Sequence, residues 1–129
     1  MRDNRFVFEK LDVWHDAKQV AILIYKVTNT FPASEQYGLA SQMKRSAVSV
    51  PSNLAEGTSR TSFKDQAHFS QIAYSSLMEV ACQTVIAKDL GFLEEETYQQ
   101  IRIAIQQLSA RIAALRNSQK KRLQLKVEG

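Results

Sequence analysis

Chain breakers are scarce in this sequence, and their scarcity limits the folds that it can adopt. Its 129 residues contain four glycines and two prolines, whereas a β-sandwich or barrel needs a turn signal about every 8–12 residues. The hydrophobic fraction of 44% and the charged fraction of 23% are ordinary for a globular protein, so wholesale disorder is not expected. We therefore expect one helical domain, with a mixed α/β fold as the less favoured alternative.

Apolar residues recur at three- and four-residue spacing in four segments, which predicts four amphipathic helices. We place these helices at residues 12–31, 34–59, 62–89 and 93–117. Asp12, Ser34 and Ser62 are the expected N-caps of the first three, and Gly91 is the expected C-terminal cap of the third. Because the connections are short, neighbouring helices should be antiparallel. The predicted fold is all-α, an antiparallel up-down-up-down four-helix bundle.

Pro51 lies in the middle of the second segment, where it removes one backbone donor. The apolar stripe stays in phase on both sides of it, with Met43 and Ala47 before and Leu54 after. We therefore predict a local bend, at a cost of about 3 kcal/mol unless the surroundings compensate, and no break of the helix.

The third segment has apolar or small residues on every side of its helical wheel. Between Gln66 and Ala87 its only charged residue is Glu79. A helix that is apolar all round is buried all round, whereas each helix of a lone four-helix bundle leaves one side in water. The extra apolar face predicts a second contact, most simply with another copy of the chain. The alternative is a set of scattered exposed apolar residues, which are common on protein surfaces.

A polar stripe lies beside the apolar stripe of the second segment. It consists of Gln42, Ser46, Ser49, Asn53, Glu56 and Arg60. In an antiparallel hairpin of the second and third segments, Glu79 is level with Gln42 to Arg45, and a buried carboxylate needs a partner. Arg45 or Gln42 is therefore expected to pair with Glu79. We interpret the stripe, with Arg45 and Glu79, as a structural polar network that fixes helix register, and we favour this role over catalysis.

The positive charge of the chain lies towards its C-terminus. Six of the 17 Lys and Arg residues follow residue 110, with only one of the 13 Asp and Glu residues. They are Arg111, Arg116, Lys120, Lys121, Arg122 and Lys126. We predict that these six bind nucleic acid by neutralising phosphates; the alternative is a solvated helix end whose cations favour the negative end of the helix dipole. Since the apolar pattern weakens past Asn117, residues 1–117 are predicted as the bundle and residues 118–129 as a basic tail that frays.

Patterns typical of catalysis and of metal binding are absent from the sequence. His15 and His68 each lack a Cys or His three or four residues away, and the single cysteine, Cys82, cannot form a disulfide within the chain. No Gly-rich phosphate loop or nucleophile elbow is present. We predict no enzyme, no metal and no cofactor. Because a signal-like N-terminus and a membrane-spanning stretch are also lacking, we expect a cytoplasmic protein without a membrane partner.

Several stretches of the chain together resemble one protein family. They are residues 8–14, 31–39, 42–57 and 75–79, of which Ser-Asn-Leu-Ala-Glu-Gly at 52–57, with Gln42 and Arg45 upstream, is the most specific. They are similar to the four-helix-bundle family of proteins encoded in intervening sequences of bacterial 23S ribosomal RNA genes. The similarity covers about residues 8–117. One departure is Tyr74-Ser75-Ser76, where family members commonly have Gly before the Ser.

The resemblance implies a bundle that assembles into a homopentameric ring. It also implies kinship with the accessory variability protein of diversity-generating retroelements, a basic pentamer that binds nucleic acid and a reverse transcriptase. We therefore expect a non-enzymatic bacterial adaptor whose partners are copies of itself, RNA or DNA, and a reverse transcriptase or another protein. Residues 1–110 are slightly acidic, unlike the retroelement proteins. The alternative is a protein–protein interaction module whose partner docks on a helical groove without nucleic acid.

Overall fold

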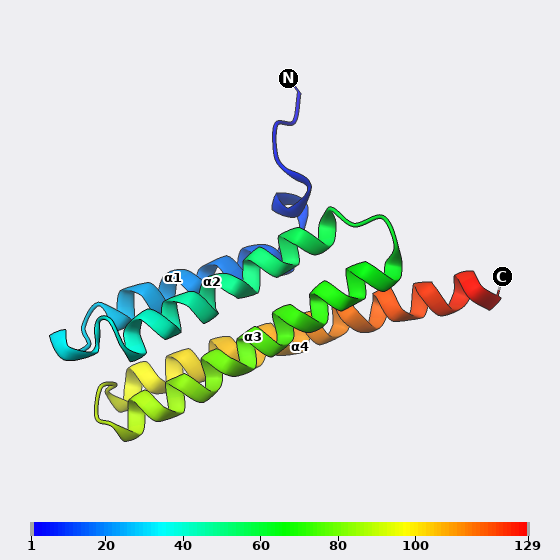
Figure 1. Cartoon of the computed structure of the whole chain (residues 1–129). Coiled ribbons are helices and arrows are strands. Elements are labelled where there is room, and N and C mark those ends of the chain that lie inside the picture. The colour runs from blue at the N-terminus through cyan, green and yellow to red at the C-terminus, as the bar shows by residue number, and fades with distance from the viewer. Residues whose placement is uncertain (1, 129) are drawn as a thin grey trace.

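Four α-helices form an up-down-up-down bundle in the computed structural model of the chain, which describes residues 2–128 (Figure 1). The helices are α1 (Asp12–Thr28), α2 (Leu39–Thr58), α3 (Phe63–Asp89) and α4 (Glu95–Glu128), with short 3-10 helices η1 (Val7–Lys10) and η2 (Ala33–Glu35). No strand occurs within residues 2–128. The predicted all-α four-helix bundle is confirmed.

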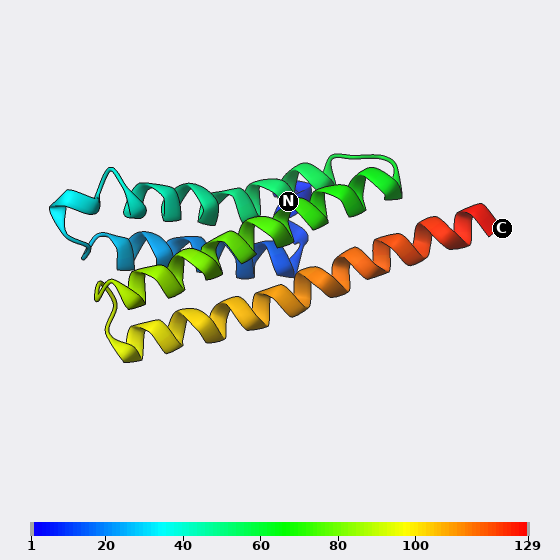
Figure 2. The same ribbon diagram turned by 60° about the horizontal axis from the view of Figure 1, so that its bottom comes forward.

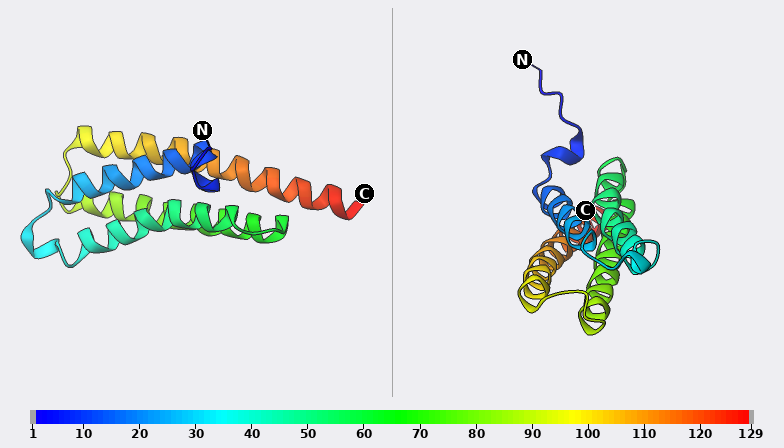
Figure 3. Two further views of the ribbon diagram at one scale, coloured as in Figure 1. Left: turned by 90° about the horizontal axis from the view of Figure 1, so that it is seen from above. Right: turned by 90° about the vertical axis from the view of Figure 1, so that its left-hand side faces the viewer.

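One hydrophobic core lies between the four helices. Its fully buried side chains include Ile24 of α1, Met43 of α2, Leu77 of α3, and Ile101 and Ile112 of α4. Each helix contributes the inward stripe that its three- and four-residue spacing predicts. Successive helices lie side by side, and α1 and α4, which close the bundle, form the smallest contact among the four neighbouring pairs (Figures 2 and 3). Within the described residues, the helices are too short or too polar to cross a membrane.

The first helix is shorter than predicted and has a different cap. Leu11, and not Asp12, is the N-cap of α1, and no side chain bonds the free N–H groups there. The helix ends at Thr28, because the Phe31 N–H then bonds the Thr28 carbonyl three residues back, at 3.1 Å, in a tighter turn. Pro32 follows this turn and cannot continue a helix.

The second helix begins five residues later than predicted. Ser34 lies in η2 and caps nothing, and Gly38 is the N-cap of α2. Glu35 still acts on the helix end, since its Oε2 accepts a hydrogen bond from the Leu39 N–H at 3.3 Å. Past this start the helix runs unbroken through the buried Pro51, so the predicted absence of a chain break is confirmed.

Both predicted caps of α3 are confirmed. Ser62 Oγ accepts a hydrogen bond from the Asp65 N–H at 3.1 Å. Gly91 has a φ of 82°, and the Phe92 N–H reaches back to the Ala87 carbonyl at 2.9 Å. This left-handed glycine and its backward hydrogen bond end the helix as a Schellman motif.

Acidic residues surround the turn from α3 into α4. Glu94, Glu95 and Glu96 are exposed, and the last two lie in the first turn of α4, where the helix dipole favours negative charge. A hydrogen bond from Gln99 and an ion pair with Lys88 lower the pKa of Glu95. The Lys88 Nζ to Glu95 Oε2 distance is 3.3 Å, so this pair bridges the two helices.

The last helix continues well past its predicted end. It runs through Asn117 to Glu128 and projects beyond the turn between α2 and α3 (Figures 1 and 3). Gln119 is buried, and its Oε1 accepts a hydrogen bond from Ser70 Oγ at 2.7 Å. This bond holds α4 against α3 beyond the point where the apolar pattern weakens. The segment predicted to fray is therefore helical as far as Glu128.

Leu77→Ala should lower the free energy of unfolding by about 2–5 kcal/mol, because it opens a cavity at a fully buried position. Val48→Ala, on the exposed side of α2, is the control and should change this free energy by no more than about 0.5 kcal/mol. Urea unfolding followed by circular dichroism, at one fixed protein concentration, measures both. Equal losses for the two variants would contradict the placement of the core.

Candidate functional site

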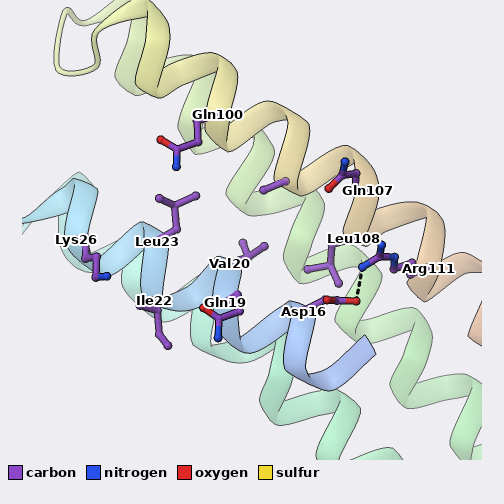
Figure 4. A pocket seen from close by; sticks show the side chains of 11 residues that line it. Asp16, Gln19, Val20, Ile22, Leu23, Lys26, Gln100, Gln107, Leu108 and Arg111 are labelled. Atoms are coloured by element: carbon purple, nitrogen blue, oxygen red, sulfur yellow. Dashed lines mark hydrogen bonds and ion pairs between the residues drawn. The ribbon is translucent and has the colours of Figure 1, made fainter. Parts of the chain in front are cut away.

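The six cations near the C-terminus divide into two groups. Arg111 and Arg116 contact neighbouring helices. Arg111 Nη1 lies 2.5 Å from Asp16 Oδ2 of α1 (Figure 4). Arg116 Nη1 donates to Gln71 Oε1 of α3 at 2.7 Å, and its guanidinium lies 5.2 Å from the centre of the Tyr74 ring. These two arginines hold α4 in the bundle, although the exposed Arg111 pair contributes at most about 1 kcal/mol.

The other four cations are exposed and unpaired. We call Lys120, Lys121, Arg122 and Lys126 the basic end. None of the four makes a hydrogen bond, ion pair or ring contact with another residue of the described part of the chain. They follow Gln119 on the stretch of α4 that projects from the bundle (Figure 3). Their charges are therefore free to meet an anionic partner.

The middle of the polar stripe of α2 faces α3, as a register-fixing network should. Ser49 Oγ lies 2.9 Å from Ser76 Oγ of α3, and Gln83 Nε2 of α3 donates to Ser46 Oγ at 3.2 Å. Within α2, Asn53 Nδ2 donates to Ser49 Oγ at 3.0 Å and to the Ser49 carbonyl at 2.8 Å. The two bonds between α2 and α3 join the helices at matched heights and so oppose sliding of one along the other.

The predicted pairing of a buried Glu79 with Arg45 or Gln42 is wrong. All three side chains are exposed, and no hydrogen bond or ion pair joins them among the described residues. The inward stripe of α3 runs through Val80, its immediate neighbour, which turns Glu79 outwards into water. Gln83, one helical turn further on, meets α2 instead.

The remaining pair of the predicted network lies at the surface. Glu56 Oε1 is 2.6 Å from Arg60 Nη2, an exposed pair one turn apart, and the Arg60 guanidinium lies 4.8 Å from the centre of the Phe69 ring. Gly57 lies between these two residues in sequence and faces α3. A Cβ added at Gly57 would lie 3.2 Å from Phe69 Cβ. The absent side chain at Gly57 lets α2 and α3 approach closely.

Sequence reasoning missed the α3 partners in this network and the bond between Ser70 and Gln119. It identified the polar stripe on α2 and assigned the wrong residue opposite. The sequence signal that could have identified these partners is the presence of polar residues at inward positions of an otherwise apolar helix. Ser70, Gln83 and Thr84 occupy such positions, and all three are buried. Hydrogen-bonding side chains at such positions indicate polar partners on the facing helix.

A groove that sequence reasoning did not single out runs between α1 and α4. Its central hollow has a volume of about 350 Å³ (Figure 4). Val20, Leu23 and Leu108 supply apolar lining, and Gln19, Gln100 and Gln107 supply amides. Within the described residues no cluster of His, Cys, Asp and Glu could hold a metal ion.

These features define a class of protein: an antiparallel bundle of four helices whose last helix extends as a free basic end. A family model described as 23S rRNA-intervening sequence protein matches residues 9–114, and the chain belongs to this family. The resemblance found in the sequence is confirmed. The matched region stops before the basic end begins. A comparison with curated proteins finds no match.

Gln83→Met should leave the free energy of unfolding unchanged or raise it by about 1 kcal/mol. Gln83 Oε1 is buried without a hydrogen-bond partner in the described structure, and methionine removes this acceptor at similar volume. Ser46 Oγ keeps its bond to the Gln42 carbonyl at 3.0 Å. Urea unfolding measures the change, with Gln83→Ala as the control that opens a cavity. A clear loss of stability in the methionine variant would contradict this expectation and would show that the hydrogen bonds of the Gln83 amide outweigh its unpaired oxygen.

Proposed function

We propose that this protein is a non-enzymatic bacterial adaptor that binds nucleic acid through the basic end of α4. The observation that carries the proposal is the exposure of four cations that have no partner among the described residues. Lys and Arg side chains at a phosphate backbone release condensed counterions, which gives affinity that depends little on sequence and strongly on salt. We place this role in the cytoplasm, where bacterial RNA and DNA lie.

Self-assembly is the second part of the proposal, and the outward side of α3 supports it. Met78 is 37% exposed, Val85 37% and Ile86 45%, and Leu90, just past the helix end, is 56% exposed. These side chains lie on α3 away from the inward Leu77, so the helix is apolar on two sides, and a second chain would cover the outer one. The resemblance implies a homopentameric ring. Such a ring would repeat the basic end and let several weak phosphate contacts act together.

Replacing all four residues of the basic end by Gln should weaken nucleic-acid binding at least about tenfold. The slope of log K against log salt concentration should become shallower by about 3–4, since each duplex phosphate contact contributes about 0.9. Fluorescence anisotropy with labelled DNA duplex and RNA hairpin, over a salt series, measures both quantities. The matched control removes four positive charges from α1 and α2, by Gln at Lys18, Lys26, Lys44 and Arg45.

Two results would overturn the nucleic-acid function. One is the absence of binding to every DNA and RNA probe at low salt. The other is a basic-end variant that binds as tightly as the unaltered protein, or that loses no more affinity than the control variant. In either case the cations would serve only to solvate the helix end.

Val85→Asp should shift the protein towards smaller assemblies, because it buries a charge at the proposed contact between copies. Ser52→Asp on the exposed side of α2 is the control, and circular dichroism checks that both variants are folded. Sedimentation velocity across a concentration series measures the assembly. A parent protein that stays monomeric at high concentration would remove this part of the proposal.

The groove between α1 and α4 favours a second candidate function, the docking of a helix from a protein partner. Its lining combines apolar side chains with three glutamines and the charged Asp16, Lys26 and Arg111, which suits an amphipathic helix. A reverse transcriptase is the partner that the resemblance suggests. Capture of that enzyme should survive neutralisation of the basic end and be lost in Ala104→Arg, which fills the groove.

A further inference from the structure

The inward stripe of α4 changes from apolar to cationic where the helix leaves the bundle. Within the bundle the stripe consists of Leu108, Ile112, Leu115 and Gln119, which are buried or half-buried. The same heptad spacing continues with Arg122 and Lys126, both of which are exposed. An apolar helix packed there would leave two charges without water or a counter-charge. This stretch is therefore suited to an anionic surface.

The cations of the basic end lie on two opposite sides of the helix. At 3.6 residues per turn, the mean direction of Lys120 and Lys121 lies about 170° from that of Arg122 and Lys126. A single row of phosphates on a flat surface would engage one pair and leave the other in water. Two rows, one on each side of the helix, would engage both pairs.

Leu125 points along the direction that bisects the two pairs, about 110° from the inward stripe of α4. Its side chain is 59% exposed. Leu123 lies on the opposite bisector, and its side chain is half-buried. The projecting helix thus has two cationic flanks and one exposed apolar edge between them.

We propose that the basic end enters the major groove of B-form duplex DNA as a helix. This inference rests on the proposed nucleic-acid function and adds the form of nucleic acid that is bound. An α-helix with its side chains is about 10–12 Å across, and the major groove is about 12 Å wide and bordered by two phosphate rows. The paired flanks meet these rows, and Leu125 faces the floor, where thymine methyl groups offer apolar contact.

The length and the direction of α4 allow this insertion. The nine residues from Lys120 to Glu128 form a helix about 13 Å long, and this length lies along the groove between its two phosphate rows. Because the end projects beyond the α2–α3 turn, the bundle does not block the approach (Figures 1 and 3). Continuous basic helices enter the major groove in this way in other proteins. The major groove of A-form RNA is too narrow for side chains to read, so duplex RNA does not offer the same site.

The test compares a labelled DNA duplex with an RNA duplex of the same sequence, using the full chain and anisotropy over a salt series. Two variants remove opposite flanks: Lys120→Gln with Lys121→Gln, and Arg122→Gln with Lys126→Gln. Each should weaken DNA binding about tenfold, to within about threefold of the other, and reduce the salt slope by about 2. The control, Lys26→Gln with Arg45→Gln, removes the same charge elsewhere and should leave the slope unchanged.

Leu125→Ala, which leaves the charge unchanged, and a dye bound in the major groove provide readouts that a flat contact would not move. The alanine should weaken DNA binding by removing the apolar contact at the groove floor, and the dye should compete with the protein, whereas a minor-groove ligand should not. Equal affinity for the RNA duplex, or dependence on one flank only, would overturn the groove insertion and leave the proposed function standing. Absence of binding to every nucleic acid would instead overturn the proposed function, and this inference with it.

Discussion

The close packing of α2 on α3 is the contact on which the rest of the structure depends. The missing side chain at Gly57 favours this contact, because a Cβ there would lie 3.2 Å from Phe69 Cβ, closer than most Cβ contacts in proteins. Hydrogen bonds between Ser49 and Ser76 and between Gln83 and Ser46 then fix the height of one helix relative to the other. Because α4 packs on the next side of α3, this register also sets where α4 leaves the bundle.

Much of the fold could be predicted from the sequence, because the apolar spacing and two of the caps are local signals. Ser62 and Gly91 each act through a hydrogen bond or a backbone angle within a few residues, and both were predicted correctly. Ser34 was not, because Glu35 reaches the same helix end from a 3-10 turn. The end of α4 was missed because its inward stripe turns cationic at Arg122 and Lys126, which is typical of a basic tail in sequence, whereas the bond from Ser70 to Gln119 depends on a distant residue.

The candidate site was predicted in part. Charge counting located the cations, but it could not separate Arg111 and Arg116, which contact neighbouring helices, from the four that have no partner in the described part of the chain. That distinction depends on which residues of the neighbouring helices lie opposite each side chain. The wrong pairing predicted for Glu79 has the same cause. For Glu79 the predicted hairpin register was nearly right. The direction in which each side chain points around the axis of α3 was the deciding factor: the carboxylate of Glu79 is exposed, whereas the amide of Gln83 is buried.

The unbroken course of α4 has a consequence for any cyclic assembly of this chain. In a cyclic ring whose axis runs along the helices, every copy points the same way, so all the projecting helix ends would emerge from one rim. Glu94, Glu95 and Glu96 lie at the other end of α4 and would gather on the opposite rim. Such a disc would be polarised, with one face attracted to a polyanion and the other repelled by it. The disc would then approach nucleic acid with the same face each time, before any contact with the bases.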